Sequence, residues 1–264
     1  MPTFKITVAY DGTDFVGWQR QASGVSVQSL LEDALRELDG RDVAVASAGR
    51  TDAGVHALGQ VAGFSLARSI EADAVLRALN ARLPDSVRVL AADDAADTFH
   101  PRFDARAKRY RYRIWNGMIG SPFERRYAWH IQERLDVEAM DAAARMVEGR
   151  HDFAAFQGSG GATRTTVREI FVSRIADCGL GIGPAPESVI ESAIRDPKSA
   201  ILVYEVTGTG FLRHMVRAIA GTLVEVGRGR HRPEWIADVI ASADRAAAGP
   251  TAPAHGLFLV AVDY

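Results

Sequence analysis

The first residues of the chain alternate between hydrophobic and polar side chains, as a half-buried β-strand requires. Phe4, Ile6, Val8 and Tyr10 fall on one face of residues 4–10. The turn sequence Asp-Gly-Thr follows at once, so the strand is expected to end there.

The next hydrophobic positions have the spacing of an amphipathic helix. Ser26 precedes them, and serine is a favoured N-cap residue because its side chain accepts a hydrogen bond from the first helical turn. Gly40 follows them and is expected to stop the helix. The inward positions of this helix are Val27, Leu30, Leu31, Leu35 and Leu38.

Strand and helix patterns continue to alternate along the whole chain. The other elements expected in the first half are a strand at 43–48, a strand at 60–66, a helix capped by Asp73 and closed by Pro84, and a strand from 87. Those expected in the second half are strands at 109–115, 165–175, 200–207 and 257–262, helices at 136–147 and 211–226, and a short helix with Pro233 in its first turn. Residues 177–199 are rich in Gly, Pro and Ser and predict a loop insertion. Each half therefore interleaves strands and helices as a split βαβ unit does.

Composition places the chain among ordinary globular proteins. Its 264 residues suffice for one large or two medium domains, with 47% hydrophobic and 24% charged residues. No apolar run is long enough to span a bilayer, and the first residues lack the pattern of a signal peptide. The single cysteine, Cys178, excludes an intramolecular disulfide and a cysteine-cluster metal site. A reducing, cytoplasmic location is the expectation that follows.

The net charge of −2 argues against a nucleic-acid partner, but its distribution argues for one. Residues 100–113 hold six basic residues and one acid, a local balance of +5. Residues 213–232 hold five arginines and one glutamate, a balance of +4. Phosphate contact depends on the charge of the facing surface rather than on the total, so both clusters favour an RNA partner.

The stretch AGRTDAGVH, residues 48–56, is the first candidate for chemistry. Asp52 follows a predicted strand on a tight loop, where a carboxylate can act as nucleophile, base or metal ligand. Arg50 would project to the same side of an extended segment and could hold a phosphate or a displaced base. Taken alone, however, the stretch more often forms an ion-paired surface turn. Its local chemistry does not decide between these interpretations.

The sequence offers no metal or nucleotide-binding pattern. His56 lies four residues after Asp52, and the other histidines considered, His100, His130 and His151, are scattered without a ligand spacing. No glycine-rich phosphate loop opens a helix, and no serine sits in a nucleophile elbow. We therefore expect neither metal nor cofactor.

The stretch KRYRYRI, residues 108–114, is the second candidate. As a strand it presents Tyr110, Tyr112 and Ile114 on one face and arginines on the other. Rings that stack on bases beside guanidinium groups that meet phosphates suit RNA, but a half-buried edge strand with a solvated basic face has the same pattern. Both interpretations remain open. The arginines concerned are Arg109, Arg111 and Arg113.

The third candidate is the start of the helix expected at 211–226. Arg213 and Arg217 are four residues apart and would share one face at the positive end of that helix. His214 and Arg217 lie beside an otherwise apolar run, which indicates at least one buried charge. A buried arginine requires a carboxylate partner, and Asp52 is a candidate.

Together these stretches resemble the bacterial tRNA pseudouridine synthase A family. The resemblance is carried, in chain order, by YDGTDFVGWQ at 10–19, AGRTDAGVHA at 48–57, FHPRF at 99–103, KRYRYRI at 108–114, GFLRHMVRAIAG at 210–221 and APAHGL at 252–257. It spans nearly the whole chain and departs mainly at 177–199, which is longer than usual.

The resemblance implies the pseudouridine synthase fold, of class α+β. Two split-βαβ, ferredoxin-like halves would join in a continuous, mostly antiparallel sheet with helices on one side. The domains would be residues 1–104, carrying Asp52, and residues 105–264, carrying the 177–199 insertion. The protein would be a cytoplasmic homodimer.

The resemblance also implies the activity and the site. The enzyme would be an isomerase, an intramolecular transferase that converts uridine to pseudouridine at positions 38, 39 and 40 of the tRNA anticodon stem-loop without cofactor or metal. The implied catalytic residues are Asp52, Tyr110 and Arg217, with Arg217 paired to Asp52 and Tyr110 as the active-site ring. The residues implied in substrate or RNA binding are Arg50, Arg20, Tyr110, His56, Arg102, Arg109, Arg111, Arg213 and His214; His56 is interpreted chiefly as a support of the loop.

These roles fit the chemistry. The target base must leave the stack, which costs a few kcal/mol and needs replacement contacts such as a stacking ring or an inserted arginine. A neighbouring cation would lower the pKa of the Asp52 carboxyl and keep it ionised. The carboxylate can add to the base or to the sugar, or remove a sugar proton, and all three routes are compatible with the sequence. The alternatives are a non-catalytic RNA-binding or chaperone module and a carboxylate-dependent hydrolase of a small metabolite.

Overall fold

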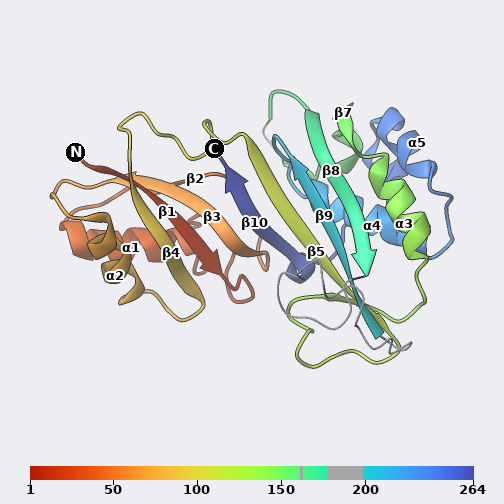
Figure 1. Ribbon diagram of the computed structural model, residues 1–264, viewed down its shortest axis with the longest axis horizontal. Coiled ribbons are helices and arrows are strands. Elements are labelled where there is room, and N and C mark those ends of the chain that lie inside the picture. Colours follow the sequence, from red (N-terminus) through yellow and green to blue (C-terminus); the bar gives the residue numbers. More distant parts are fainter. Residues whose placement is uncertain (161–162, 178–198) are drawn as a thin grey trace, which may run out of the picture. The chain divides into compact units, whose positions relative to one another are not determined.

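The computed structural model describes residues 1–160, 163–177 and 199–264, and within them the chain divides into two compact units. The first unit contains Met1–Lys108 and Phe258–Tyr264, and the second contains Arg109–Leu257. Figure 1 follows the chain through both units. The loop insertion expected at 177–199 falls almost entirely on 178–198, outside the described residues.

The first unit is a mostly antiparallel sheet with two helices packed against it. The strand order is β4-β1-β3-β10, with β2 paired to β3, and only the β10–β3 pairing is parallel. The helices α1 and α2 contact each other and turn their apolar faces inward. The elements are β1 (Thr3–Tyr10), α1 (Val27–Asp39), β2 (Ala46–Ser47), β3 (His56–Ser65), α2 (Ala72–Asn80), β4 (Val87–Ala95) and β10 (Leu257–Asp263).

The second unit repeats this arrangement. Its strands follow the order β5-β9-β8-β7, with the short β6 paired in parallel to β5, and its helices α3 and α4 contact each other. The elements are β5 (Ala107–Gly117), β6 (Trp129–Ile131), α3 (Val137–Arg145), β7 (Gly149–Asp152), η1 (Ala154–Phe156), β8 (Val167–Asp177), β9 (Ser199–Gly208), α4 (Met215–Gly227), α5 (Trp235–Ser242), η3 (Arg245–Ala247) and η4 (Ala254–Gly256). The expected α+β class, mostly antiparallel, is confirmed.

The ends of α1 are those the sequence predicts. The hydroxyl of Ser26 accepts a hydrogen bond from the backbone N–H of Ser29, and the Ser29 hydroxyl accepts one from the Ser26 N–H, which completes a capping box. Gly40 adopts a left-handed conformation (φ 73°) and closes the helix.

Two neighbouring predictions need correction. The strand expected at 43–48 is shorter than predicted: β2 covers Ala46 and Ser47, because the backbone of Val45 bonds to the side chains of Gln28 and Glu32 on α1. The helix expected to be capped by Asp73 and closed by Pro84 is α2, which ends at Asn80. Its N-cap is Glu71, and Asp73 lies within the first turn. The strands β6 and β7 were not expected at all.

Candidate active site

The loop of residues 48–56 connects β2 to β3 and presents two polar side chains to solvent. Arg50 is exposed and Asp52 is half-buried, while Thr51 between them is buried. The Val55 N–H donates to the Asp52 carbonyl (3.1 Å) in a tight turn, and Gly54 takes a positive φ of 76°. The loop therefore carries an accessible carboxylate on a fixed backbone.

Two buried side chains of the sheet, Tyr10 and Gln60, support this loop. The hydroxyls of Tyr10 on β1 and Thr51 lie 2.7 Å apart, and the Gln60 amide on β3 donates to the Gly49 carbonyl (2.8 Å). Burial raises the pKa of Tyr10 to about 12, against the lowering effect of hydrogen bonding from Thr51 and Gln60. The phenol is therefore neutral at physiological pH, and the residues on both sides of Arg50 are tied to the sheet.

The segment after β1 packs against the loop through glycines. A Cβ atom on Gly12 would lie 2.0 Å from the Val55 carbonyl oxygen, and one on Gly17 (φ 108°) would lie 2.7 Å from the Thr51 oxygen. The Trp18 N–H donates to that same Thr51 oxygen (3.0 Å). The sequence predicted Gly12 only as part of the turn that ends the first strand, and it predicted no contact of Gly12 or Gly17 with this loop.

His56 is part of the loop's support. Its side chain is buried, and its ring stacks on Phe258 of β10 with centroids 4.6 Å apart. Its Nδ1 accepts a hydrogen bond from the Gly12 N–H (3.0 Å), and the Asp11 carboxylate lies 3.1 Å from the same atom. In the neutral ring an accepting Nδ1 leaves the proton on Nε2. The stacking contact and the hydrogen bond therefore engage the His56 ring within the first unit, where it supports the loop.

Lys108 was missed as a contact of this loop. Its Nζ donates to the carbonyl of Ala48 (2.7 Å) at the loop's start. The sequence marked Lys108 only as one member of a basic cluster, and a contact between positions 60 residues apart has no sequence signal.

The other candidates of the first unit differ in their availability. Arg20 is held by carboxylates of α1, with Glu32 at 2.8 Å and Asp33 at 3.1 Å, and both hydrogen bonds raise its pKa. Arg102 is exposed on the loop that follows β4. Arg20 therefore offers a phosphate less uncompensated charge than Arg102 does.

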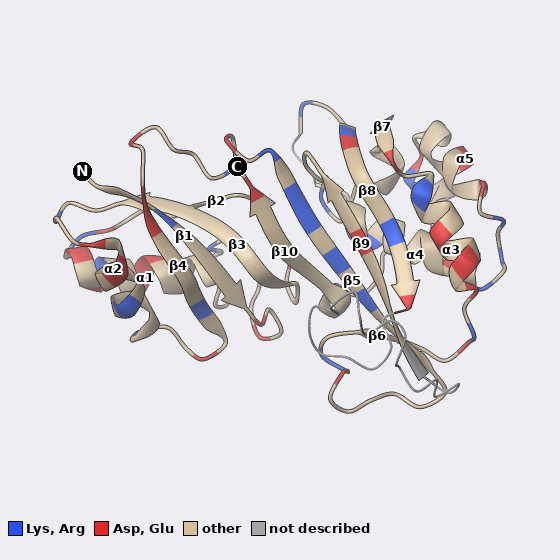
Figure 2. Cartoon of the chain, in the orientation of Figure 1, with Lys and Arg blue, Asp and Glu red and all other residues tan. Residues whose placement is uncertain are grey.

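The strand β5 has the two faces that KRYRYRI predicts. Tyr110, Tyr112 and Ile114 are buried, and Tyr110 meets Phe211 edge to face with centroids 5.0 Å apart. Figure 2 shows basic positions repeated along β5. On that other face Arg109 is exposed, Arg111 pairs with Glu205 (3.0 Å), and Arg113 pairs with Glu124 (2.9 Å).

The helix expected at 211–226 begins four residues later than predicted. His214 adopts a left-handed conformation (φ 61°), which a helix cannot contain, so α4 starts at Met215. Arg213 consequently lies outside the helix, where its guanidinium donates to the Ser159 carbonyl (2.8 Å). Arg213 and Arg217 therefore do not share a helical face.

Arg217 is fixed by the segment that precedes β10. Its Nε donates to the carbonyl of Ala252 (2.7 Å), and the Ala252 N–H donates back to the carbonyl of Arg217 (3.1 Å). The neighbouring Tyr112 hydroxyl donates to the Pro253 carbonyl (2.8 Å). Burial raises the pKa of Tyr112, and the Arg217 cation opposes this shift. For His255, burial and the Arg217 cation both lower the pKa, against a hydrogen bond that the ring donates to the Ala128 carbonyl.

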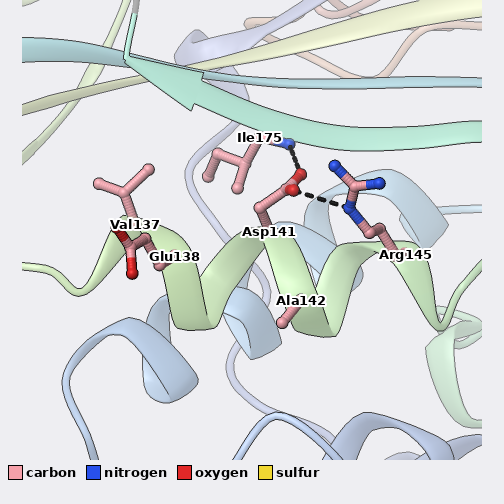
Figure 3. A pocket seen from close by; sticks show the side chains of 6 residues that line it. All are labelled: Val137, Glu138, Asp141, Ala142, Arg145 and Ile175. Atoms are coloured by element: carbon pink, nitrogen blue, oxygen red, sulfur yellow. Dashed lines mark hydrogen bonds and ion pairs between the residues drawn. The ribbon is translucent and has the colours of Figure 1, made fainter.

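A groove lies in a different part of the second unit. It has a volume of about 390 Å³ and lies between α3 and β8 (Figure 3). Asp141 accepts hydrogen bonds there from the Ile175 N–H (3.0 Å) and from Arg145 (2.8 Å). None of the candidate residues lines it.

The described residues were also considered for metal-binding clusters and membrane-spanning helices, and they hold neither. Residues 1–160, 163–177 and 199–264 contain no group of three or more His, Cys, Asp or Glu side chains placed to hold a metal ion. In the same ranges, every helix is too short or too polar to cross a membrane.

The sequence and its relatives define the class of the protein. Residues 6–104 and 143–264 match the family model described as tRNA pseudouridine synthase. The chain belongs to the tRNA pseudouridine synthase family.

Individual relatives match along the full length. The tRNA pseudouridine synthase A of Pelobacter propionicus is 46% identical over 264 residues, with both chains completely covered. That of Myxococcus xanthus is 47% identical over 264 residues, covering all of this chain and 92% of the other. That of Geotalea uraniireducens is 44% identical, again over the whole of both chains.

Proposed function

We propose that this protein converts uridine to pseudouridine at positions 38, 39 and 40 in the anticodon stem-loop of tRNAs. The observation that carries the proposal is the presentation of Asp52, an accessible carboxylate on a loop whose backbone is fixed from two sides. Named synthases that match this chain from end to end support it.

The reaction needs a carboxylate and a positioned base, and both requirements fit the first unit. The C–N glycosidic bond breaks, the uracil turns, C5 bonds to C1′, and the C5 proton is lost while nitrogen regains one. Electrons and atoms balance within one nucleotide, so no redox cofactor is required. Asp52 would start the reaction at the base or the sugar, and Arg50 would occupy the space of the flipped base.

The second unit would supply the remaining groups. Tyr110 would stack on the uracil and assist the removal of the C5 proton. Arg217 would pair with the catalytic carboxylate and hold it in place by a charge-assisted hydrogen bond. The exposed Arg109 is the β5 arginine best suited to a phosphate, because Arg111 and Arg113 already have carboxylate partners.

The assembly belongs to the same proposal. We propose that the two compact units correspond to the two domains expected from the sequence, that the enzyme works as a homodimer, and that it acts on tRNA in the cytoplasm. Sedimentation of the purified protein with and without tRNA tests the dimer.

Replacement of the Asp52 carboxyl tests the catalytic assignment. Asp52→Asn and Asp52→Ala should abolish pseudouridine formation in unmodified tRNA, because the amide and the methyl group can neither add nor accept a proton. The matched control is Asp42→Asn, which changes a side chain that is 93% exposed in the same unit and should retain full activity. Pseudouridine is mapped by position, and tRNA affinity is measured in parallel.

The binding measurement separates the alternatives. Both Asp52 variants should bind tRNA within about threefold of the wild type, since phosphate contacts dominate RNA affinity. Full activity of Asp52→Asn would contradict the assignment. A wild type that binds tRNA but forms no pseudouridine would indicate the non-catalytic RNA-binding module instead.

A further inference from the structure

The loop between β4 and β5 exposes an aromatic ring that the proposed function leaves unexplained. Phe103 is 75% exposed, although its neighbour Pro101 is buried. Single exposed hydrophobic residues are common and by themselves indicate nothing. This ring is distinguished by how firmly the loop holds it.

Hydrogen bonds within the loop fix the backbone that carries the ring. The Nδ1 atom of His100 accepts from the N–H groups of Arg102 (3.1 Å) and Phe103 (3.3 Å). The N–H of His100 in turn donates to the Asp104 carboxylate (2.9 Å). The Tyr264 hydroxyl at the end of the chain donates to the Pro101 carbonyl (2.7 Å) and anchors the loop to its unit.

The ring of Phe103 has two neighbours within the loop. The His100 ring packs on it with centroids 4.2 Å apart and planes tilted by 34°. The guanidinium of Arg102 lies 5.9 Å from the ring centroid, within the range of a cation–π contact. Because three quarters of the side chain is still exposed, a further planar group can stack on it.

The charge around the ring suits a phosphate. Arg102 and Arg106 are both exposed on this loop. The one acid between them, Asp104, already accepts the His100 amide hydrogen bond. A pre-positioned aromatic ring with guanidinium groups beside it is the combination that holds an unpaired nucleotide, with the base on the ring and the phosphate on the arginine.

We propose that Phe103 is a stacking platform for an unpaired base of the RNA substrate and that Arg102 binds the adjoining phosphate. The nature of that RNA rests on the proposed function. Bases within a duplex are covered on both faces by their neighbours, so the platform distinguishes the looped part of a stem-loop from its paired part.

The test compares two leucine variants on two RNAs. Phe103→Leu removes the ring but keeps an apolar side chain, and Phe123→Leu makes the same change at another phenylalanine, which is 82% exposed. The RNAs are an unmodified anticodon stem-loop and a blunt duplex with the same number of phosphates, and binding is followed by fluorescence anisotropy at fixed salt.

Phe103→Leu should weaken stem-loop binding about five- to hundred-fold and leave duplex binding unchanged, as the loss of one base–aromatic stack predicts. Phe123→Leu should match the wild type on both RNAs. Phe103→Tyr should stay within about twofold of the wild type, since it retains the ring. Thermal unfolding of Phe103→Leu at the wild-type temperature verifies that the variant is folded.

Two results would overturn the platform: unchanged stem-loop affinity of Phe103→Leu, or an equal loss on both RNAs. Pseudouridine formation by the wild type is scored separately. If the wild type makes no pseudouridine but Phe103→Leu still loses only stem-loop affinity, the platform stands and the proposed function fails. If the wild type is active and Phe103→Leu binds the stem-loop normally, the proposed function stands and the platform fails.

Discussion

At the scale of single residues, buried side chains of the sheet fix the conformation of the loop of residues 48–56. Thr51 is buried against the hydroxyl of Tyr10, and the Gly49 carbonyl is held by Gln60. Between and beside these fixed points, Arg50 and Asp52 reach the surface. A buried polar group without a partner costs about 1–3 kcal/mol, so this arrangement disfavours other loop conformations.

Gly12 tests how close the packing under this loop is. Gly12→Ala would bring a methyl group to 2.0 Å from a backbone oxygen that cannot swing away, so it should destabilise the protein by roughly 3 kcal/mol or more and lower the activity. Gly49→Ala is the matched control, because its nearest neighbour within 4 Å is the flexible Lys108 Nζ at 3.6 Å. Urea unfolding of both variants makes the comparison, and equal stabilities would refute the close approach.

Single residues also show where sequence reasoning succeeded. Asp52 was a candidate because it is a carboxylate that follows a predicted strand. An ion-paired surface turn was also compatible with the same sequence. The contacts that distinguish the loop, from Gly12, Tyr10 and Lys108, come from positions 41 to 60 residues away in the chain. Local patterns carry no information on such distances.

At the scale of elements, hydrophobic spacing predicted the existence of most helices and strands, and caps decided their ends. The limits of α1 were predictable because Ser26 and Gly40 act locally. The start of α4 was not, because the apolar spacing continues through 211–214 while His214 leaves the helical conformation. The end of α2 was missed for a similar reason: the Asn80 side chain bonds to the backbone of Val89 on β4.

The conformation of His214 predicts an order of stabilities among its variants. A left-handed backbone costs a β-branched residue more than asparagine, by roughly 1–2 kcal/mol. His214→Asn should therefore be more stable than His214→Val by about that amount, with thermal unfolding as the measurement. Activity should fall with His214→Val in parallel, since the first turn of α4 carries Arg217. Equal stability of the two variants would show that φ is not held positive.

At the scale of the whole molecule, both units bury tyrosines whose phenols must stay neutral. Burial raises the pKa of Tyr10, Tyr112, Tyr204 and Tyr264 above the ordinary value of 10.0. A group whose pKa is higher in the folded state stabilises the fold fully below its unfolded pKa and loses that contribution as pH rises through the folded value.

The protein should therefore lose stability as the pH rises above 10. For Tyr10 alone, a pKa of about 12 corresponds to a contribution of up to about 2–3 kcal/mol that disappears between pH 10 and pH 12. Urea unfolding at pH 8, 9, 10 and 11 measures the slope. Tyr10→Phe should be less stable than the wild type at pH 8 but show a shallower decline. If stability declines equally with pH in the wild type and in Tyr10→Phe, groups other than Tyr10 cause the loss of stability at high pH.

The sequence by itself determined the α+β class, the order of most elements, the two faces of β5 and the family, because hydrophobic period, helix caps and motif letters are all local properties. The tertiary structure decided which of these residues contact one another. These supports of the loop of residues 48–56 come from segments far apart in the chain: Gly12 and Gly17 follow β1, His56 begins β3, and Lys108 lies at the start of β5. Packing and hydrogen bonding between distant segments set these contacts, and neither has a signal in the local pattern of the sequence.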